Sequence, residues 1–490
     1  MPWYKITLFA TYFVVLGILS FYGFHRSALV WLYYRNKNKI SKPKRYFTDH
    51  LLPKITIQCP LYNEIYVAER LIEAVAKINY PRDRFEIQVL DDSTDETQTI
   101  ARSKVEELKK TGLDISYIHR TDRSGFKAGA LEEGVKVAKG EFIMVFDADF
   151  MPKPDMLKKM VHYFTDDNVG MVQARWGHVN RNYSTLTEIE AIMLDGHFVI
   201  EHTARHRSGR FFNFNGTAGI WRKDTIIDAG GWHHDTLTED LDLSFRAQLK
   251  GWDFIYLPDI VSPAELPVEM NSFKSQQFRW AKGSIQVAKK LLPTILKADV
   301  GKRIKLEAFV HLTANFAYPL LFLLSILLLP NLLLRTEHGW REVVLIDLPL
   351  MFGTTLSVCS FYIASQRNLD LKRPPSGWLR FALRLPLTLS LGIGLCINQT
   401  RAVLEAVFGR DTAFIRTPKH GLETRDQSWS LKRYRATKNL VPYIELMMAI
   451  YLTCGVVIAF RNQHFFALPF LLLFTAGFGY IGTMSVCQRN

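Results

Sequence analysis

Two acidic motifs follow apolar segments that are typical of β-strands. Asp147-Ala148-Asp149 comes directly after Phe142–Phe146 (FIMVF), and Asp91-Asp92 comes directly after Phe85–Leu90 (FEIQVL). Two carboxylates one residue apart can hold a divalent ion together with a phosphate, because Mg²⁺ and Mn²⁺ prefer oxygen ligands. Aspartate also favours turns, so either motif alone is weak evidence. Together they favour one site for a metal-bound diphosphate.

A third acidic motif, Thr238-Glu239-Asp240, precedes an amphipathic segment at Leu241–Leu249. Thr238 can cap a helix there, and acidic residues stabilise a first helical turn, which is a purely structural explanation. A carboxylate held at a helix start can also accept a proton from an attacking hydroxyl, as general-base catalysis requires. Asp240 is therefore a candidate catalytic base.

A basic and aromatic motif, Gln276–Trp280 (QQFRW), lies on a predicted amphipathic helix. A basic helix at a membrane surface would have a similar composition. In a catalytic site, Arg279 could bind a diphosphate leaving group through its planar guanidinium. Trp280 could stack against a sugar and donate a hydrogen bond.

The elements that must position these motifs alternate between short strands and amphipathic helices from about residue 46 to residue 300. The predicted strands are Lys54–Cys59, Phe85–Leu90, Ile115–His119 and Phe142–Phe146, and the predicted helices are Val67–Lys77, Thr97–Lys110 and Lys127–Ala138. This order predicts an α/β domain with a mostly parallel sheet and helices on both faces. Ligands bind at the carboxyl ends of such strands, where both aspartate motifs stand.

Apolar segments flank this domain. The first, within residues 1–35, precedes a basic cluster, and five more lie in the region 301–490, near 307–334, 343–365, 381–407, 441–460 and 465–486. Each approaches or exceeds the roughly 20 residues that cross a bilayer. A signal peptide is the alternative for the first segment, but a basic start and a clear cleavage site are lacking. A retained N-terminal transmembrane helix is favoured, with its basic end in the cytoplasm.

The segment 381–407 is difficult to assign as a single membrane crossing. The loops before and after it, 366–380 and 410–438, are both rich in Lys and Arg and are therefore expected in the cytoplasm. A single crossing cannot join two loops on the same side. We therefore predict that 381–407 is an interfacial segment, followed by a cytoplasmic loop at 408–440, and that the domain at 46–300 is also cytoplasmic.

The composition excludes some classes of protein. The 490 residues carry 61 Lys and Arg against 47 Asp and Glu, a net charge of +14. Membrane flanks and a phosphate-rich ligand both account for this excess. Nucleic acid is not expected as a partner, because zinc-finger spacing and a basic arm with interleaved aromatics are absent. The five cysteines are far apart and without a Cys-x-x-Cys motif, so they are expected to be reduced packing residues.

In this order the motifs resemble those of the processive family 2 glycosyltransferases of the cellulose synthase superfamily, nearest its mannan and glucan synthase-like branch. Four further segments carry the resemblance: Pro60–Glu64 (PLYNE), Phe126–Gly129 (FKAG), Asn215–Thr217 (NGT) and Phe414–Lys419 (FIRTPK). The last is similar to the loop that closes over the donor in that family, except that Arg416 replaces a valine.

The resemblance implies a GT-A-type domain with a helical transmembrane region. It implies a membrane-bound, metal-dependent, inverting transferase that moves a hexose from UDP-glucose or GDP-mannose to a growing β-glycan, with the membrane helices as a route for the product. Asp240 would be the base, and Asp147 and Asp149 would hold Mg²⁺ or Mn²⁺. The implied donor-binding residues are Tyr62, Glu64, Asp91, Lys127, Arg279, Thr417 and Lys419, and the acceptor-binding residues are Gly216, Glu239, Gln276 and Trp280.

Two alternatives stay open. A lipid glycosyltransferase, which adds one sugar to ceramide or diacylglycerol, would share the metal and base motifs, and the FIRTPK and QQFRW motifs weigh against it. A non-catalytic scaffold would be expected to lose acidic positions that this chain keeps. UDP-glucose and GDP-mannose are not separated by these motifs. For the location, a bacterial inner membrane is preferred over a Golgi membrane.

Overall fold

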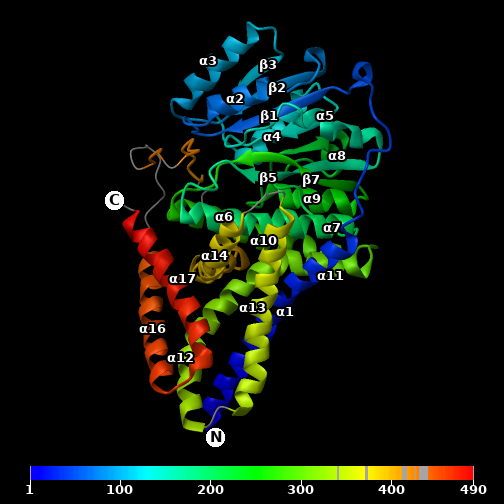
Figure 1. Cartoon of the computed structure of the whole chain (residues 1–490). Coiled ribbons are helices and arrows are strands. Elements are labelled where there is room, and N and C mark those ends of the chain that lie inside the picture. Colours follow the sequence, from blue (N-terminus) through cyan, green and yellow to red (C-terminus); the bar gives the residue numbers. More distant parts are fainter. Residues whose placement is uncertain are drawn as a thin grey trace.

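The computed structural model describes residues 2–338, 341–369, 374–410, 416–424, 426–429 and 440–488. An α/β domain forms one end of the molecule, and long helices extend away from it (Figure 1). Its sheet has seven strands in the order β3-β2-β1-β4-β6-β5-β7. They are β1 (Ile55–Leu61), β2 (Phe85–Asp91), β3 (Ile115–His119), β4 (Phe142–Val145), β5 (Val169–His178), β6 (Gly219–Arg222) and β7 (Asp253–Ala264).

The sheet is mostly parallel, as predicted. β1 pairs in parallel with β2 and β4, β2 with β3, and β5 with β7, whereas β6 runs antiparallel to both β4 and β5. All residues of β2 and β4 are buried. Strands buried on both faces tend to be continuous apolar runs, which explains why FIMVF was recognisable in the sequence, whereas β2 also buries Glu86 and Gln88.

Helices cover both faces of the sheet. Along β4, Phe142 and Met144 pack in one core with α2, α3 and α5, and Ile143 and Val145 pack in another with α4 and α9. Alternate side chains of a strand point to opposite faces, so one short strand contributes to both cores. The helices of this domain are α2 (Ala68–Ala76), α3 (Thr97–Lys109), α4 (Phe126–Val137), α5 (Met156–Val161), α6 (Thr185–Asp195), α7 (Thr203–Arg207), α8 (Lys223–Asp228) and α9 (Glu239–Leu249).

Short helices of other types complete the domain and its connections. The 3₁₀ turns are η1 (Asp49–Leu51), η2 (Arg82–Arg84), η3 (His162–Thr165), η5 (Ala314–Phe316) and η6 (Phe465–Ala467). The segment η4 (Gly196–His202) is π-helical and connects α6 to α7.

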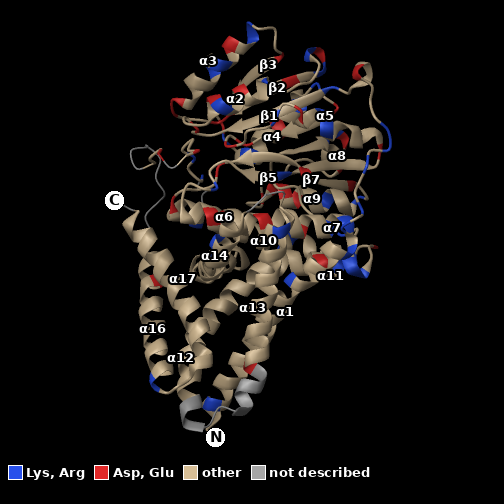
Figure 2. Ribbon diagram, viewed as in Figure 1, with Lys and Arg blue, Asp and Glu red and all other residues tan. Residues whose placement is uncertain are grey.

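The remaining helices are α10, which ends the predicted cytoplasmic domain, and those of the N-terminal segment and the region 301–490. They are α1 (Trp3–Asn36), α10 (Met270–Lys297), α11 (Lys302–Thr313), α12 (Ala317–His338), α13 (Arg341–Asn368), α14 (Pro375–Gly394), α15 (Cys396–Val407), α16 (Val441–Arg461) and α17 (Leu468–Cys487). Among the described residues, six helical segments are long and apolar enough to cross a bilayer. Figure 2 shows that Lys, Arg, Asp and Glu gather on the α/β domain and are sparse along these helices.

One of the six segments, Pro375–Val407, comprises α14 and α15. In Figure 1, α14 is seen nearly along its axis beneath the α/β domain, whereas α1, α12, α13, α16 and α17 run away from that domain. Arg384 bonds Glu188 of α6, and Glu405 bonds Lys282 of α10. The interfacial placement of 381–407 stays a prediction, and these contacts with the α/β domain are consistent with it.

Candidate active site

A cavity of ≈200 Å³ lies at the carboxyl ends of β1 and β4, between the sheet and α10. All the site residues expected from the sequence line it except Asp91: Tyr62, Glu64, Lys127, Asp147, Asp149, Gly216, Glu239, Asp240, Gln276, Arg279, Trp280, Thr417 and Lys419. They come from segments more than 350 residues apart in the chain (Tyr62 to Lys419). The sequence gives only the order of these motifs along the chain, whereas the fold brings them together in one site.

Asp147 and Asp149 each bind a lysine ammonium group. Lys127 Nζ lies 2.5 Å from Asp147 Oδ1, and Lys419 Nζ lies 2.6 Å from Asp149 Oδ2. Two carboxylates at a strand end are oxygen ligands of the kind that Mg²⁺ and Mn²⁺ prefer, and their lysine partners show that they attract cations. The residues therefore fit a hard divalent ion, which would compete with the two ammonium groups.

A second acidic group lies outside this cavity. One ligand atom from each of His233, Asp235 and Asp242 lies within 4.8 Å of the others, close enough to share an ion. However, Lys290 Nζ already lies 2.8 Å from Asp235 Oδ1 and 2.9 Å from Asp242 Oδ1, and Arg246 bonds Asp242 at 2.7 Å. His233, Asp235 and Asp242 do not line the cavity that holds the other expected site residues, so the metal prediction stays with Asp147 and Asp149.

Asp240 lies in the first turn of α9, half-buried at the wall of the cavity. Its Oδ1 accepts a hydrogen bond from the Leu241 amide at 2.8 Å, and a Cβ placed on Gly216 would lie 3.2 Å from its Oδ2. Burial, with the neighbouring Glu239 carboxylate, raises the pKa of Asp240 to about 7, while Lys127 opposes the shift. A carboxyl group that titrates near neutral pH is suited to general-base catalysis.

Gly216 allows the chain to approach Asp240 closely. It has a φ of +79°, a conformation that side-chain-bearing residues rarely adopt. Its carbonyl oxygen accepts a hydrogen bond of 3.0 Å from Lys127 Nζ, which also lies 4.0 Å from Glu239. Lys127 thus links Asp147, the turn at Gly216 and the start of α9.

The helix α10 brings Gln276, Arg279 and Trp280 to the cavity. Burial lowers the pKa of Arg279, and the surrounding carboxylates, Glu239 and Asp147 foremost, oppose this. A guanidinium surrounded by carboxylates remains charged and is placed to meet a diphosphate. The amphipathic helix predicted from the sequence therefore presents its QQFRW motif to the site, and not only to a membrane surface.

The loop Arg416–Lys419 lines the cavity together with Tyr62 and Glu64. Arg416 donates to the Tyr62 carbonyl oxygen at 3.1 Å, and Lys419 donates to the Glu265 carbonyl oxygen at 2.9 Å. Burial raises the pKa of Glu64, beside Arg416, to about 8. Arg416, which replaces the valine of the family pattern, therefore fastens the loop to the PLYNE segment. Phe414 and Ile415 of the same motif lie outside the described residues.

Asp91 is the residue that the structure places away from the cavity lining. It is fully buried, and its carboxylate accepts hydrogen bonds from Tyr117 Oη at 2.6 Å and from the Ser93 amide at 3.0 Å. Asp92 lines the cavity instead and binds Arg120. Asp91 is the last residue of β2, and consecutive side chains of a strand point to opposite sides, so the motif alone did not show which aspartate faces the ligand.

The sequence reasoning missed a pair of histidines behind the site. Asn215, which lines the cavity, donates its amide N–H to His197 Nε2 at 3.0 Å and accepts from His202 Nε2 at 2.6 Å. Burial lowers the pKa of His202 to about 3 and that of His197 well below its usual value, so both rings are neutral. A neutral imidazole offers one donor and one acceptor, which matches the two ends of the Asn215 amide.

The π-helical geometry of η4 explains how two residues five apart can meet. A π-helix bonds i to i+5 and brings such residues close, whereas in an α-helix they would point in different directions. The ring centroids of His197 and His202 are 4.3 Å apart. His197 also bonds Glu201 at 3.0 Å, and Glu201 pairs with Arg26 of α1 and with Arg205. This chain of contacts links the turn at Asn215 to the first membrane helix.

We expect His197→Ala to lower kcat/KM for the acceptor about 10-fold, since one hydrogen bond to a neutral group is worth about 1–1.5 kcal/mol. Donor affinity should not change, because His197 lies behind Asn215 and away from the donor residues. His206→Ala is the matched control: His206 bonds Ser41 at 3.3 Å. Steady-state kinetics with varied acceptor checks this, and equal losses in both variants would contradict it.

The comparisons with known proteins agree with this site. Residues 53–283 match the model of the glycosyltransferase-like family 2. The chain is 33% identical over 458 residues to glucomannan 4-beta-mannosyltransferase 1 of Oryza sativa subsp. japonica, covering 88% of this chain and 83% of that protein. It is 32% identical over 470 residues to glucomannan 4-beta-mannosyltransferase 1 of Cyamopsis tetragonoloba, covering 91% and 84%.

Among solved structures, the fold matches the mannosyltransferase PcManGT from Pyrobaculum calidifontis, determined with GDP-Man and Mn²⁺. The TM-score is 0.50 at 22% identity, and the match covers 74% of this chain and 99% of that one. At this identity the likeness concerns the fold.

A mostly parallel sheet with acidic strand ends, a carboxylate at a helix start and an attached set of apolar helices defines a membrane-associated glycosyltransferase of the GT-A type. The chain belongs to the family 2 glycosyltransferases, in their cellulose synthase-like branch. The curated relatives compared above are plant proteins, so the preference for a bacterial inner membrane over a Golgi membrane finds no support in them.

Proposed function

We propose that the protein transfers mannose from GDP-mannose to the end of a growing β-1,4-linked glycan, with its catalytic domain in the cytoplasm. The observation that carries the proposal is the placement of Asp240. This half-buried carboxyl group, with a pKa of about 7, shares one cavity with the Asp147 and Asp149 pair and with Gln276, Arg279 and Trp280 of the QQFRW motif. The choice of mannose rests on the two relatives that are 32–33% identical over nearly the whole chain.

The donor side of the site is the part covered by the Arg416–Lys419 loop. Tyr62 and Glu64 lie there, and the Arg123 guanidinium stacks 3.2 Å from the centroid of the Tyr62 ring. Asp147 and Asp149 would hold Mg²⁺ or Mn²⁺, and such an ion, when bound, would neutralise charge on the diphosphate. Lys127 and Lys419, now bonded to these aspartates, are free to turn to phosphate oxygens when an ion replaces them.

The acceptor side is the part between Gly216, Asp240 and Trp280. The terminal hydroxyl of the glycan attacks the anomeric carbon from the face opposite the diphosphate, and Asp240 accepts its proton. The bond between the anomeric carbon and the phosphate oxygen breaks, and the electron pair leaves with the diphosphate, which Arg279 stabilises. One displacement inverts the configuration, so an α-linked donor gives a β-linked product.

Radiolabel incorporation tests the proposal. The purified full chain, in phosphatidylcholine vesicles with MgCl₂ or MnCl₂, is given GDP-[¹⁴C]mannose or UDP-[¹⁴C]glucose. We expect label from GDP-mannose in high-mass material that an endo-β-mannanase degrades. Polymer from UDP-glucose alone would overturn the choice of donor. Label only in solvent-extractable lipid would overturn the polymer acceptor and favour the lipid glycosyltransferase.

The raised pKa of Asp240 predicts a pH dependence. Because the base must be ionised, kcat/KM for the donor should fall with a slope of one below about pH 7 and level off above it. Glu64, with a pKa of about 8, is a second group that titrates nearby. The inflection near pH 7 should therefore persist in Glu64→Gln. Rates measured from pH 5.5 to 8.5 check this, and a flat profile across that range would contradict it.

A further inference from the structure

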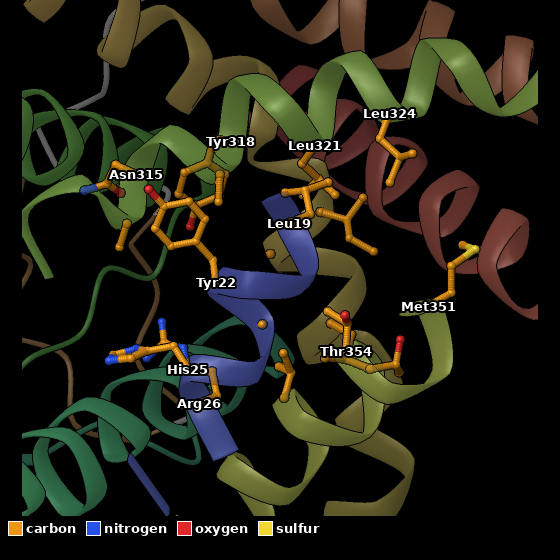
Figure 3. A pocket seen from close by; sticks show the side chains of 18 of the residues that line it. Leu19, Tyr22, His25, Arg26, Asn315, Tyr318, Leu321, Leu324, Met351 and Thr354 are labelled. Carbon is orange, nitrogen blue, oxygen red and sulfur yellow. The ribbon is translucent and has the colours of Figure 1, made fainter. Parts of the chain in front are cut away.

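A cavity of ≈380 Å³ lies among the membrane helices, separate from the active site. Its walls come from α1, α11, η5, α12, α13, α14 and α17, and it reaches the α/β domain at η4 and α7 (Figure 3). Its chemistry does not depend on which sugar donor the enzyme uses.

One end of this cavity is aliphatic. Leu19, Leu321 and Leu324 project into it, together with Met351 (Figure 3). Such a lining has nothing to offer a water molecule, which needs two to four polar partners. A hydrocarbon chain fills this space without leaving polar groups unpaired.

Three of the hydroxyl groups in the wall already form hydrogen bonds within the protein. Tyr22 Oη donates to Thr313 Oγ1 at 3.1 Å, and Thr354 Oγ1 donates to Ser20 Oγ at 3.1 Å. Thr388 Oγ1 likewise donates to a backbone carbonyl within α14 at 2.9 Å. A sugar chain at the aliphatic end would leave its own hydroxyls without partners, at a high cost.

The other end of the cavity is charged, and its accessible charge is positive. His25 and Arg26 stand there in Figure 3. The Arg26 side chain is 37% exposed, whereas its partner Glu201 is 9% exposed and Arg205 is 3% exposed. The carboxylate and the second guanidinium are thus covered, and the guanidinium of Arg26 is the charged group that the cavity presents.

This charged end is also the end next to the catalytic domain, since Glu201 and Arg205 belong to η4 and α7. In the cytoplasmic orientation proposed above, it lies at the leaflet that carries anionic lipids. Basic pockets between membrane helices on that side are suited to anionic head groups.

We propose that this cavity binds a bilayer phospholipid with an anionic head group. One acyl chain lies among Leu19, Leu321 and Leu324, and the head-group phosphate meets Arg26. Arg26 pairs with Glu201, and Glu201 bonds His197, which in turn bonds Asn215 in the active-site cavity. The proposed lipid site is therefore connected to the turn at Asn215 by a chain of side-chain contacts.

Photocrosslinking tests the proposal. The full chain is placed in phosphatidylcholine vesicles that contain a phosphatidylglycerol with a diazirine in one acyl chain, and labelled peptides are identified by mass spectrometry. A phosphatidylcholine with the same diazirine is the neutral probe. We expect the anionic probe to label Leu16–Arg26, Val310–Leu324 and Met351–Tyr362 several-fold more than the neutral probe does.

Two variants with matched controls locate the site. Leu321→Trp fills the aliphatic end and should reduce this labelling at least 10-fold, whereas Leu323→Trp, at an exposed position of the same helix, should not. Arg26→Gln should equalise the two probes, whereas Arg35→Gln should not, because Arg35 stacks on Trp31 and does not line the cavity. Thermal unfolding verifies that each variant is folded.

Three outcomes would overturn the proposal: labelling by the anionic probe that survives in Leu321→Trp, equal labelling by both probes in the unmodified chain, or displacement of the label by a soluble β-mannan oligosaccharide. The last would make the cavity a passage for glycan. None of these outcomes depends on transferase activity, so failure here is distinct from failure of the proposed function.

Discussion

Asp240→Asn lowers kcat by about 10³-fold or more while leaving donor binding intact. Asparagine has the shape of aspartate but cannot accept a proton, and a positioned general base contributes on the order of 10²–10⁴-fold. Donor affinity is retained because Asp240 lies beside Gly216 and the start of α9, on the acceptor side of the cavity. Single-turnover transfer measures the rate, and calorimetric titration with GDP-mannose measures the binding.

The matched control is Asp224→Asn. Asp224 also stands in the first turn of a helix, α8, but is exposed and away from the cavity. It should leave both kcat and donor affinity unchanged. If Asp240→Asn kept more than a tenth of the normal rate, Asp240 would not be the base, and Glu239 would become the next candidate.

Arg279→Gln should lower kcat by about 10²–10³-fold, with a smaller change in donor KM. The guanidinium lies in the cavity beside Asp147 and Glu239, where it is placed to stabilise charge that develops on the departing diphosphate. Removing one such preorganised group costs roughly 10²–10³-fold in other enzymes. Arg279→Lys should restore only part of the rate, because an ammonium group lacks the planar fork of arginine.

Lys289→Gln serves as the control for these variants of α10. Lys289 bonds the carbonyl oxygens of Ala406 and Val407 and does not line the cavity, so its loss should not change kcat. An unchanged kcat in Arg279→Gln, with only a raised KM for the acceptor, would assign Arg279 to the acceptor and contradict its role at the leaving group.

The first half of the sheet was predictable and the second half was not. β1 to β4 are short segments rich in β-branched and aromatic residues between clear helices, and their bounds agree with the predictions to within two residues. β6 has only four residues and runs antiparallel, and β7 contains Pro258 and Pro263, which disfavour a strand assignment. Their pairing depends on partners far away in the chain, which periodicity cannot show.

The site could be predicted as a set of residues but not as a set of contacts. Nearly every residue expected from the motifs lines one cavity. The motifs did not show, however, that Asp147 pairs with Lys127 and Asp149 with Lys419, two lysines from segments far apart in the chain. The contact between His197 and His202 could not be predicted, because the sequence GHFVIEH is typical of an α-helix, in which these two side chains would point in different directions. Two histidines five residues apart beside a glycine are the one signal that could have suggested a π-turn.

The configuration of the product tests the central claim most directly. The purified chain in vesicles is given GDP-mannose labelled with ¹³C at C1, and the polymer is analysed by NMR through the one-bond coupling of the labelled carbon. A single displacement with Asp240 as base inverts the α-linked donor and therefore predicts β-linked mannose. An α-linked product would contradict the single displacement, the role of Asp240 and the proposed function together.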